Sequence, residues 1–421
     1  MVHCPYRYSQ MLQHALASGK MRVAFLFGAG CPMSIRIPDG DTTTAPLIPD
    51  ILSLTALVKE GIAKEPKETG HQSTLTQILE QFPASENPTI EHILSHIRLL
   101  LEVIRKDDLD GITQKVLKSL DVKMCAIITE CVQASIPDNQ PFSPYHQFAK
   151  WVSAIPRDYP VEIFTTNYDL LIEQSLEDQR VPYFDGFIGS KRAFFDLPSI
   201  EHDKLPPRWA RLWKLHGSIN WWKTNNGHIE RRALSDAGEQ QMIYPSHLKY
   251  DQSRRLPYLA MLDRMKVFLA PGKGPAVFVT CGYSFADQHL NELLLQSLRG
   301  NPSAVCYTLL FGNKEDPAYK EACDCAKRQP NLRLLAKNGA IIGTVEGLWD
   351  SDPKDGHPLR DYVTREAPPQ QTPPTSGDSE VSATSKLLLG DFAYLGKFLL
   401  QQCDQQLSQE ISTNPVNVAG N

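Results

Sequence analysis

The sequence lacks several features that would place it in a broad class of proteins. In its 421 residues no apolar run reaches the roughly 20 residues needed to cross a bilayer, and the N-terminus lacks the segments of a secretory signal. Forty-three Lys and Arg stand against 48 Asp and Glu, so the net charge of −5 offers no broad basic surface for nucleic acid or anionic membranes. We therefore expect a cytoplasmic globular protein with no membrane contact and no direct nucleic-acid binding.

The cysteines lack the pattern of a disulfide framework or a zinc site. They number nine, an odd count, and are scattered along the chain, which favours reduced thiols. Cys323 and Cys325 are the one close pair, but no second pair or nearby histidine completes a tetrahedral site. We expect no zinc, and we expect these two cysteines to lie on a helix that begins near Asp316 and Pro317.

Short apolar runs recur along the chain and predict the strands of an α/β fold. The first run, 22–27, ends at a Gly-Ala-Gly turn, as a buried parallel strand would. Similar runs occupy 161–166, 211–215, 276–281, 304–311 and 340–342. Helical segments separate these runs, so we predict a Rossmann-like, mostly parallel sheet with a large helical insertion.

The insertion is expected over about 50–150, because the first two predicted strands are too far apart for one crossover helix. Asn87 and Pro88 suggest the start of a helix that carries apolar residues at helical spacing from Ile90. Segments 50–64, 74–82 and 112–134 are also helical in pattern. We assign 1–366, with this insertion, to one main domain.

The end of the sequence differs in composition. Residues 367–384 are rich in Pro, Ser and Thr and predict a linker. In 385–421, Leu388, Phe392, Leu395 and Leu399 follow the spacing of an amphipathic helix and tail. Gly390 and Gly396 weaken this helix, so it needs a surface to dock on: its own core, a sister subunit or another protein.

Glycine or polar residues follow four of the predicted strands. Gly28-Ala29-Gly30 allows a pyrophosphate to approach the backbone, although Met33 replaces the third glycine of the dinucleotide fingerprint; alone, it is equally a tight turn. Thr165-Thr166-Asn167-Tyr168-Asp169 follows the second strand, where its polar residues either meet a ligand or cap the next helix.

The other two clusters follow later strands. Leu215-His216-Gly217-Ser218 places a histidine at a strand end, and 282–287 holds Gly282 and Ser284, which suit a phosphate or ribose hydroxyl, and Asp287, which suits a helix cap. Each cluster taken alone could have a purely structural role, as a turn or a helix cap. Four together at the strand ends of one sheet favour a ligand site.

In this order and spacing, the four clusters resemble the sirtuin-like superfamily, and more closely its bacterial NAD hydrolases that act in anti-phage defence. The resemblance spans roughly 22–313. It implies that Gly28, Ala29 and Gly30 receive the NAD phosphates, that Asn167 positions the ribose and the attacking water, and that Asp169 binds the nicotinamide carboxamide. His216 matches the catalytic histidine, and Gly282, Ser284 and Asn313 match positions that contact the pyrophosphate or the adenosine ribose.

These residue types suit cleavage of the bond between nicotinamide and ribose. Nicotinamide leaves as a neutral molecule and needs no general acid, while positive charge builds on an oxocarbenium-like ribose. An imidazole, which titrates near pH 6.5, is suited to take a proton from water or a ribose hydroxyl.

The departures from the family are informative. Protein-deacylating sirtuins carry a zinc ribbon after the catalytic histidine, and no cysteine lies between His216 and Cys281. Water is therefore favoured as the nucleophile. The remaining hypotheses are NAD-dependent deacylation or ADP-ribosyl transfer, and a non-catalytic module that senses NAD or ADP-ribose.

The resemblance also implies control by assembly, since uncontrolled hydrolysis of NAD would kill the cell. The chain has no Gly-x-x-x-x-Gly-Lys-Ser/Thr motif of its own. We expect a homo-oligomer and a second defence protein, a HerA-type hexameric ATPase in preference to an Argonaute-like partner.

Overall fold

The computed structural model describes most of the chain. The described residues are 1–39, 43–83, 87–104, 112–202, 204–224, 226, 228–233, 240–243, 257–350, 357–366 and 384–413. Most of the predicted linker, 367–383, lies outside them. Among the described residues, no helix is both long and apolar enough to cross a membrane.

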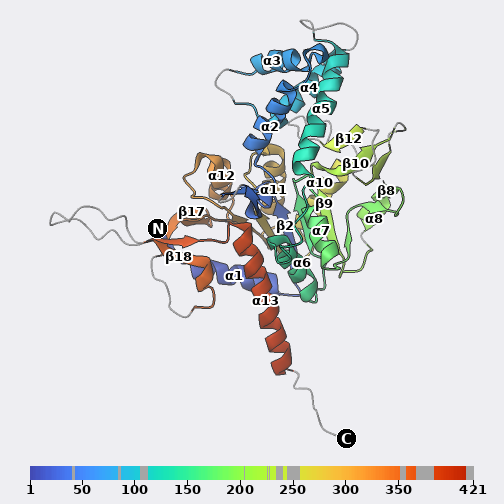
Figure 1. Ribbon diagram of the computed structural model, residues 1–421. Coiled ribbons are helices and arrows are strands. Elements are labelled where there is room, and N and C mark those ends of the chain that lie inside the picture. Colours follow the sequence, from blue (N-terminus) through green and yellow to red (C-terminus); the bar gives the residue numbers. More distant parts are fainter. Residues whose placement is uncertain are drawn as a thin grey trace, which may run out of the picture.

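A ten-stranded sheet forms the centre of the described structure (Figure 1). Its spatial order is β1-β17-β16-β15-β14-β13-β2-β5-β9-β6. The strands are β1 (Val2–His3), β2 (Arg22–Phe27), β5 (Glu162–Thr165), β6 (Tyr183–Phe184), β9 (Ala210–Lys214), β13 (Ala276–Cys281), β14 (Ala304–Leu309), β15 (Leu332–Leu335), β16 (Gly339–Ile342) and β17 (Val345–Trp349). All neighbours from β15 to β6 are parallel, which confirms the predicted mostly parallel α/β sheet.

One predicted parallel strand has the opposite direction. Residues 340–342 fall in β16, which runs antiparallel to both β15 and β17. Only residues 336–338 separate β15 from β16, and a connection that short forms a hairpin, whereas a parallel pair needs a crossover.

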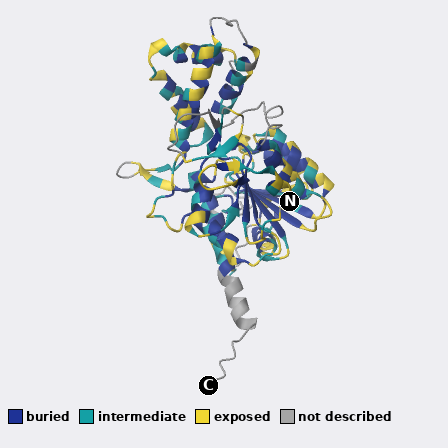
Figure 2. Cartoon of the chain, turned by 90° about the vertical axis from the view of Figure 1, so that its right-hand side faces the viewer, coloured by how far each residue is buried: buried dark blue, intermediate teal, exposed yellow. Residues whose placement is uncertain are grey.

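Helices cover both faces of the sheet, so its central strands are buried on both sides (Figure 2). In β2, Val23, Phe25 and Phe27 face one apolar cluster, while Ala24 and Leu26 face the other. The helices of the main domain are α1 (Pro5–Ala17), α6 (Pro144–Ala154), α7 (Leu171–Asp178), α8 (Leu197–His202), α10 (Tyr258–Leu269), α11 (Gln288–Gly300), α12 (Lys320–Arg328) and α13 (Phe392–Thr413). This two-sided burial explains why these strands are continuous apolar runs.

The remaining strands form smaller sheets. A five-stranded sheet has the order β12-β10-β11-β8-β7, and its members are β7 (Phe187–Ile188), β8 (Ala193–Phe195), β10 (Gly217–Lys223), β11 (Ile229–Arg231) and β12 (Gln240–Ile243). Two further pairs are β3 (Arg36–Asp39) with β4 (Thr43–Pro46), and β18 (Val363–Glu366) with β19 (Thr384–Leu387). Four short 3₁₀ turns also occur in the described residues: η1 (Pro32–Ser34), η2 (Lys67–Thr69), η3 (Pro317–Tyr319) and η4 (Arg360–Tyr362).

The insertion is helical, as predicted, and rises from one end of the sheet in Figure 1. Its helices are α2 (Ile51–Ala63), α3 (His71–Glu80), α4 (Ile90–Val103) and α5 (Gln114–Val132). The expected start of α4 at Asn87 and Pro88 is wrong: Thr89 is the N-cap, and it forms a capping box with His92. Helix α6 overlaps the end of the predicted range, but it packs mainly against α7 and α13 of the main domain rather than against the helices of the insertion.

Helix α12 carries Cys323 and Cys325, and both thiols are buried. The expected helix start near Asp316 is confirmed, because the Asp316 side chain caps η3, which leads directly into α12. Among the described residues, no group of three or more His, Cys, Asp or Glu is arranged to hold a metal ion.

Helix α13 docks on the chain's own core. Phe392 stacks edge-on against Tyr145 of α6, with ring centroids 4.9 Å apart, and Leu395 and Leu399 are fully buried. The predicted start of this helix is wrong, because Leu388 and Gly390 lie between β19 and α13, and only Gly396 is in the helix. Close packing explains both glycines. A Cβ atom at Gly390 would lie 1.9 Å from the Leu310 carbonyl oxygen, and one at Gly396 would lie 2.6 Å from Gln147 Oε1.

We expect Gly390→Ala to lower the free energy of unfolding by about 3 kcal/mol, because the backbone of Leu310 must move to admit the methyl group. Gly300→Ala is the matched control, since a Cβ atom there meets nothing within 4 Å. Urea denaturation of the two variants measures the difference. Equal stability of both would show that α13 does not pack as described.

Candidate functional site

The four sequence clusters meet at the carboxyl edge of the central sheet. They follow β13, β2, β5 and β9, which are consecutive neighbours and mutually parallel. Successive loops are joined by backbone hydrogen bonds: Gly28 N donates to Cys281 O, Thr166 N to Phe27 O, and Ile219 N to Tyr168 O. Asn313 follows β14, the next parallel neighbour of β13. The structure thus brings all the predicted site residues to one edge.

This edge includes a point where the chain reverses its direction across the sheet. From β2 the chain adds β5 and β9 on one side, and it later returns to add β13 and β14 on the other. Open α/β sheets bind ligands in the crevice beyond such a switch point. Gly28 and Gly30, which follow β2, and Gly282, which follows β13, lie on its two sides.

The glycines are required by the close approach of these two loops. A Cβ atom on Gly28 would lie 2.3 Å from the Gly282 oxygen, and one on Gly30 would lie 2.8 Å from Gly282 Cα. Gly282 itself has φ of +66°. The amides of Gly28 and Gly30 already donate to the Cys281 and Gly282 carbonyls, whereas the amide of exposed Ala29 has no acceptor in the described part of the chain.

Asn167 is buried and held in place by this turn. Its side-chain Nδ2 donates to the Gly28 carbonyl over 3.1 Å, and its backbone amide donates to Thr165 Oγ1 over 3.0 Å. The amide oxygen, Oδ1, is the atom left to accept from a ligand hydroxyl or a water. The side chain is thus fixed beside the glycine turn before any ligand arrives.

Asp169 lies above a buried cation. Lys214, in the last position of β9, donates to the Asp169 carbonyl oxygen and forms an ion pair with Glu173 of α7 over 2.9 Å. Burial raises the pKa of the Asp169 carboxyl to about 6, and the charge of Lys214 offsets part of this rise. One Asp169 oxygen caps the start of α7 by accepting from Leu171 N over 3.1 Å.

The raised pKa predicts a pH dependence for binding of a carboxamide. The resemblance implies that Asp169 binds a carboxamide, and the ionised carboxyl is the better acceptor for it. On that role we expect the KM for NAD to rise as the pH falls through about 6, and Asp169→Asn to remove this dependence. The same shift affects folding. The unfolded carboxyl has a pKa of about 3.9. The stabilising effect of protonated Asp169 on the folded protein is therefore present at about pH 4 and is lost as the pH rises to about 6.

Steady-state kinetics between about pH 5 and about pH 8 would check the first expectation, and urea denaturation of wild type and Asp169→Asn between about pH 4 and about pH 7 would check the second. A KM for NAD that stays constant across this range in the wild type would contradict the assigned role of Asp169.

His216 makes a contact that spans the site. Its Nε2 lies 3.2 Å from Oδ2 of Asp287, and both side chains are about nine-tenths buried. A carboxylate can only accept, so the neutral imidazole carries its proton on Nε2 and its lone pair on Nδ1. Asp287 also caps α11, because its Oδ1 accepts from Leu290 N over 3.2 Å. The predicted cap is confirmed, and the same carboxylate orients the histidine.

The contact joins loops that follow β9 and β13, the outer two of four neighbouring strands. The loops that carry Gly28 and Asn167 follow β2 and β5, the two strands between them. The 282–287 loop is held by Asn291 of α11, which accepts from Tyr283 Oη over 2.8 Å and donates to Phe285 O over 2.7 Å. Ser284 and Asn313 are exposed at the rim.

Comparison with known proteins finds a likeness for part of the chain. Residues 161–335 match the model of the SIR2-like domain. This SIR2-like segment contains Asn167, Asp169, His216 and Gly282, while the Gly28 turn lies before it. The match likens this part of the chain to SIR2-like domains.

A solved structure described as "Structural Basis for the Mechanism and Regulation of Sir2 Enzymes" is similar over 75% of this chain and 90% of its own, with 11% identity and a TM-score of 0.29. A likeness this distant carries no residue roles to the present chain. No curated protein sequence matches.

Two features of the SIR2-like segment were missed by sequence reasoning. The contact of Asp287 with His216 joins residues 71 positions apart, and nothing local signals it. The sequence gives a weak indication for Lys214, because a lysine inside a continuous buried strand needs a buried partner.

Proposed function

We propose that this protein is an NAD glycohydrolase that cleaves the bond between nicotinamide and ribose. The observation that carries the proposal is the Asp287–His216 pair, which joins loops on both sides of Asn167 at the switch point of a sheet whose segment 161–335 is SIR2-like. Binding alone needs no oriented base. The pair is therefore the feature that favours an enzyme over a nucleotide-sensing module.

In the proposed reaction, water adds to the anomeric carbon of the ribose as the bond to nicotinamide breaks. NAD⁺ and water become nicotinamide, ADP-ribose and one proton. Asn167 Oδ1 orients the water or a ribose hydroxyl, and His216 Nδ1 accepts the proton. Asp287 stabilises the imidazolium that forms, as a positioning residue behind the histidine.

The position of Asp169 suits the leaving group. Its carboxylate is buried beside Asn167, where it can accept from the amide of a carboxamide. The exposed N–H of Ala29 is the group in the glycine turn that can donate to a phosphate oxygen. Both assignments follow the resemblance of the four clusters to the sirtuin-like family.

The direct experiment measures nicotinamide release from NAD by the purified protein. We expect release without any acyl-lysine peptide, together with one ADP-ribose, or its cyclised form, per nicotinamide. Dependence of the release on such a peptide would instead support deacylation, and NAD binding without products would support a sensing module. Either result would overturn the proposal.

We further propose that the activity serves anti-phage defence by depleting NAD and that it is controlled by homo-oligomer assembly with a second protein, a HerA-type hexameric ATPase. This rests on the resemblance of the four motifs. Assays alone and with the candidate partner, alongside size measurements, test it. Full activity of an isolated monomer would contradict control by assembly.

A further inference from the structure

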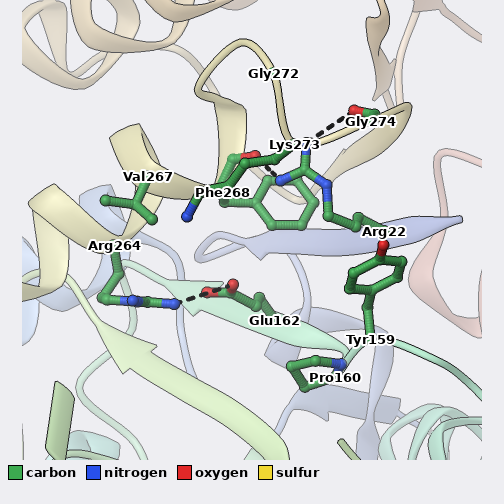
Figure 3. Close-up of a pocket in the computed structure, with 10 residues that line it drawn as sticks. All are labelled: Arg22, Tyr159, Pro160, Glu162, Arg264, Val267, Phe268, Gly272, Lys273 and Gly274. Atoms are coloured by element: carbon green, nitrogen blue, oxygen red, sulfur yellow. Dashed lines mark hydrogen bonds and ion pairs between the residues drawn. The ribbon is translucent and has the colours of Figure 1, made fainter. Parts of the chain in front are cut away.

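A second polar cavity lies at the opposite edge of the central sheet (Figure 3). Its volume is about 530 Å³, within the range of small-ligand pockets. It is bounded by the first residues of β2 and β5, Arg22 and Glu162, by α10, and by the loop that precedes β13. Along β2 it is separated from the Gly28 turn by six strand residues, or about 20 Å. It is thus distinct from the candidate active site.

The cavity carries an excess of positive charge. Arg22, Arg264 and Lys273 line it together with a single carboxylate, Glu162. That carboxylate is already engaged, since it accepts from Trp213 Nε1 over 2.7 Å and pairs with Arg264 over 3.5 Å. Its single negative charge is shared between Arg264 and Arg22, so the three cations outnumber it.

Arg22 is nine-tenths buried, and no carboxylate of the described residues forms a close ion pair with it, although the charge of Glu162 acts on it from across the cavity. Its two terminal nitrogens donate to neutral carbonyls, Phe268 O over 2.6 Å and Gly274 O over 3.0 Å, as Figure 3 shows. Its Nε has no hydrogen-bond acceptor in the described part of the chain. A buried guanidinium is stabilised when an oxyanion supplies the missing acceptor.

The rim of the cavity adds further donors and an aromatic surface. Gly272 and Gly274 have φ of +80° and +81°, and a Cβ atom at either would meet nothing within 4 Å, so the backbone of this loop is open to a ligand. Lys273 lies between them and makes no ion pair with any described residue. Tyr159 is 43% exposed beside the opening.

We propose that this cavity binds an oxyanion of the phosphate type, either free phosphate or the phosphate of a nucleotide. Arg22 Nε and Lys273 Nζ are its charged donors. Phosphate is favoured because two guanidinium groups and one ammonium line the cavity with a single carboxylate, and the cavity has room for more than the bare ion.

Isothermal titration calorimetry with inorganic phosphate, AMP and adenosine tests this inference. We expect binding of phosphate and AMP and none of adenosine. AMP that binds more tightly than phosphate identifies a nucleotide as the natural source, and equal affinities identify free phosphate. Adenosine that binds as well as AMP would overturn the proposal, as would no heat with phosphate and AMP at millimolar concentration.

Two substitutions locate the site. Lys273→Ala removes an exposed side chain and should weaken phosphate binding about tenfold without affecting folding, as the loss of one charge-assisted hydrogen bond would. Arg22→Lys keeps the charge but loses Nε and the hydrogen bonds to the Phe268 and Gly274 carbonyls that shape the cavity wall, and it should weaken binding at least as much. Lys266→Ala is the matched control, because Lys266 is exposed on α10 and pairs with Asp263 outside the cavity.

The outcomes separate this site from the candidate active site. Phosphate and AMP affinities that are the same in Lys273→Ala and wild type would place the binding elsewhere and refute the proposal, even if Arg22→Lys fails to fold. Nicotinamide release is measured on the same preparations. Phosphate binding with no NAD cleavage would support this inference and contradict the proposed function. NAD cleavage with no phosphate binding would support the proposed function and contradict this inference.

Discussion

Replacing His216 by alanine is expected to slow nicotinamide release from NAD by a factor between about 10² and 10⁴, the usual contribution of a general base. The ring lies in the loop after β9 and is oriented by Asp287 at 3.2 Å. The measurement is kcat at saturating NAD, by separation of nicotinamide from the reaction mixture.

His202→Ala is the matched control for this loss. His202 is exposed at the end of α8, where its Nδ1 contacts the Pro198 carbonyl oxygen, and it takes no part in the candidate site. Its kcat should equal that of wild type. A His216→Ala protein that is folded and retains more than a tenth of wild-type kcat would refute a general-base role.

The partner variant Asp287→Asn should produce a smaller loss, about 10- to 100-fold, the equivalent of one charge-assisted hydrogen bond. The amide still accepts from Leu290 N, so the cap on α11 survives. The acidic limb of the kcat profile should move to lower pH, because an imidazolium loses its anionic neighbour. An unshifted limb with a lower rate would instead mean that Asp287 acts only on the helix.

The sequence predicted the central strands well because their signal is local. Both β2 and β13 are six-residue apolar runs that end at glycines, and both occur at the predicted bounds. The direction of β16 was not predictable from its own composition, since an apolar run is the same whether its partner is parallel or antiparallel. The direction follows from the short connection 336–338, which permits only a hairpin between β15 and β16.

The site was predicted in part for the same reason. Each cluster follows a recognisable strand, so its place at the carboxyl edge followed from the fold. What the strands do not encode is how loops fold over that edge. The meeting of His216 with Asp287, and of Lys214 with Glu173, depends on strand order and loop path, which emerge only when the sheet assembles.

The ion pair beneath the site leads to the second large effect. Lys214→Ala is expected to lower the free energy of unfolding by about 3–5 kcal/mol, because it leaves the buried Glu173 carboxylate without a cation. The lysine is 1% exposed and Glu173 is 8% exposed, so water cannot readily replace the lost charge. Urea denaturation measures the change, and a loss below about 1 kcal/mol would contradict a buried charge pair.

A double variant separates stability from function at this position. In Lys214→Met with Glu173→Leu the pair is replaced by apolar side chains, and most of the lost stability should return. Activity should not return with it, because Lys214 also donates to the carbonyl oxygens of Tyr168 and Asp169 and so fixes the loop that carries Asn167. A stable double variant with wild-type nicotinamide release would show that the loop needs no such support. A stable but slow one would show that this buried ammonium contributes to the geometry of the site as well as to the fold.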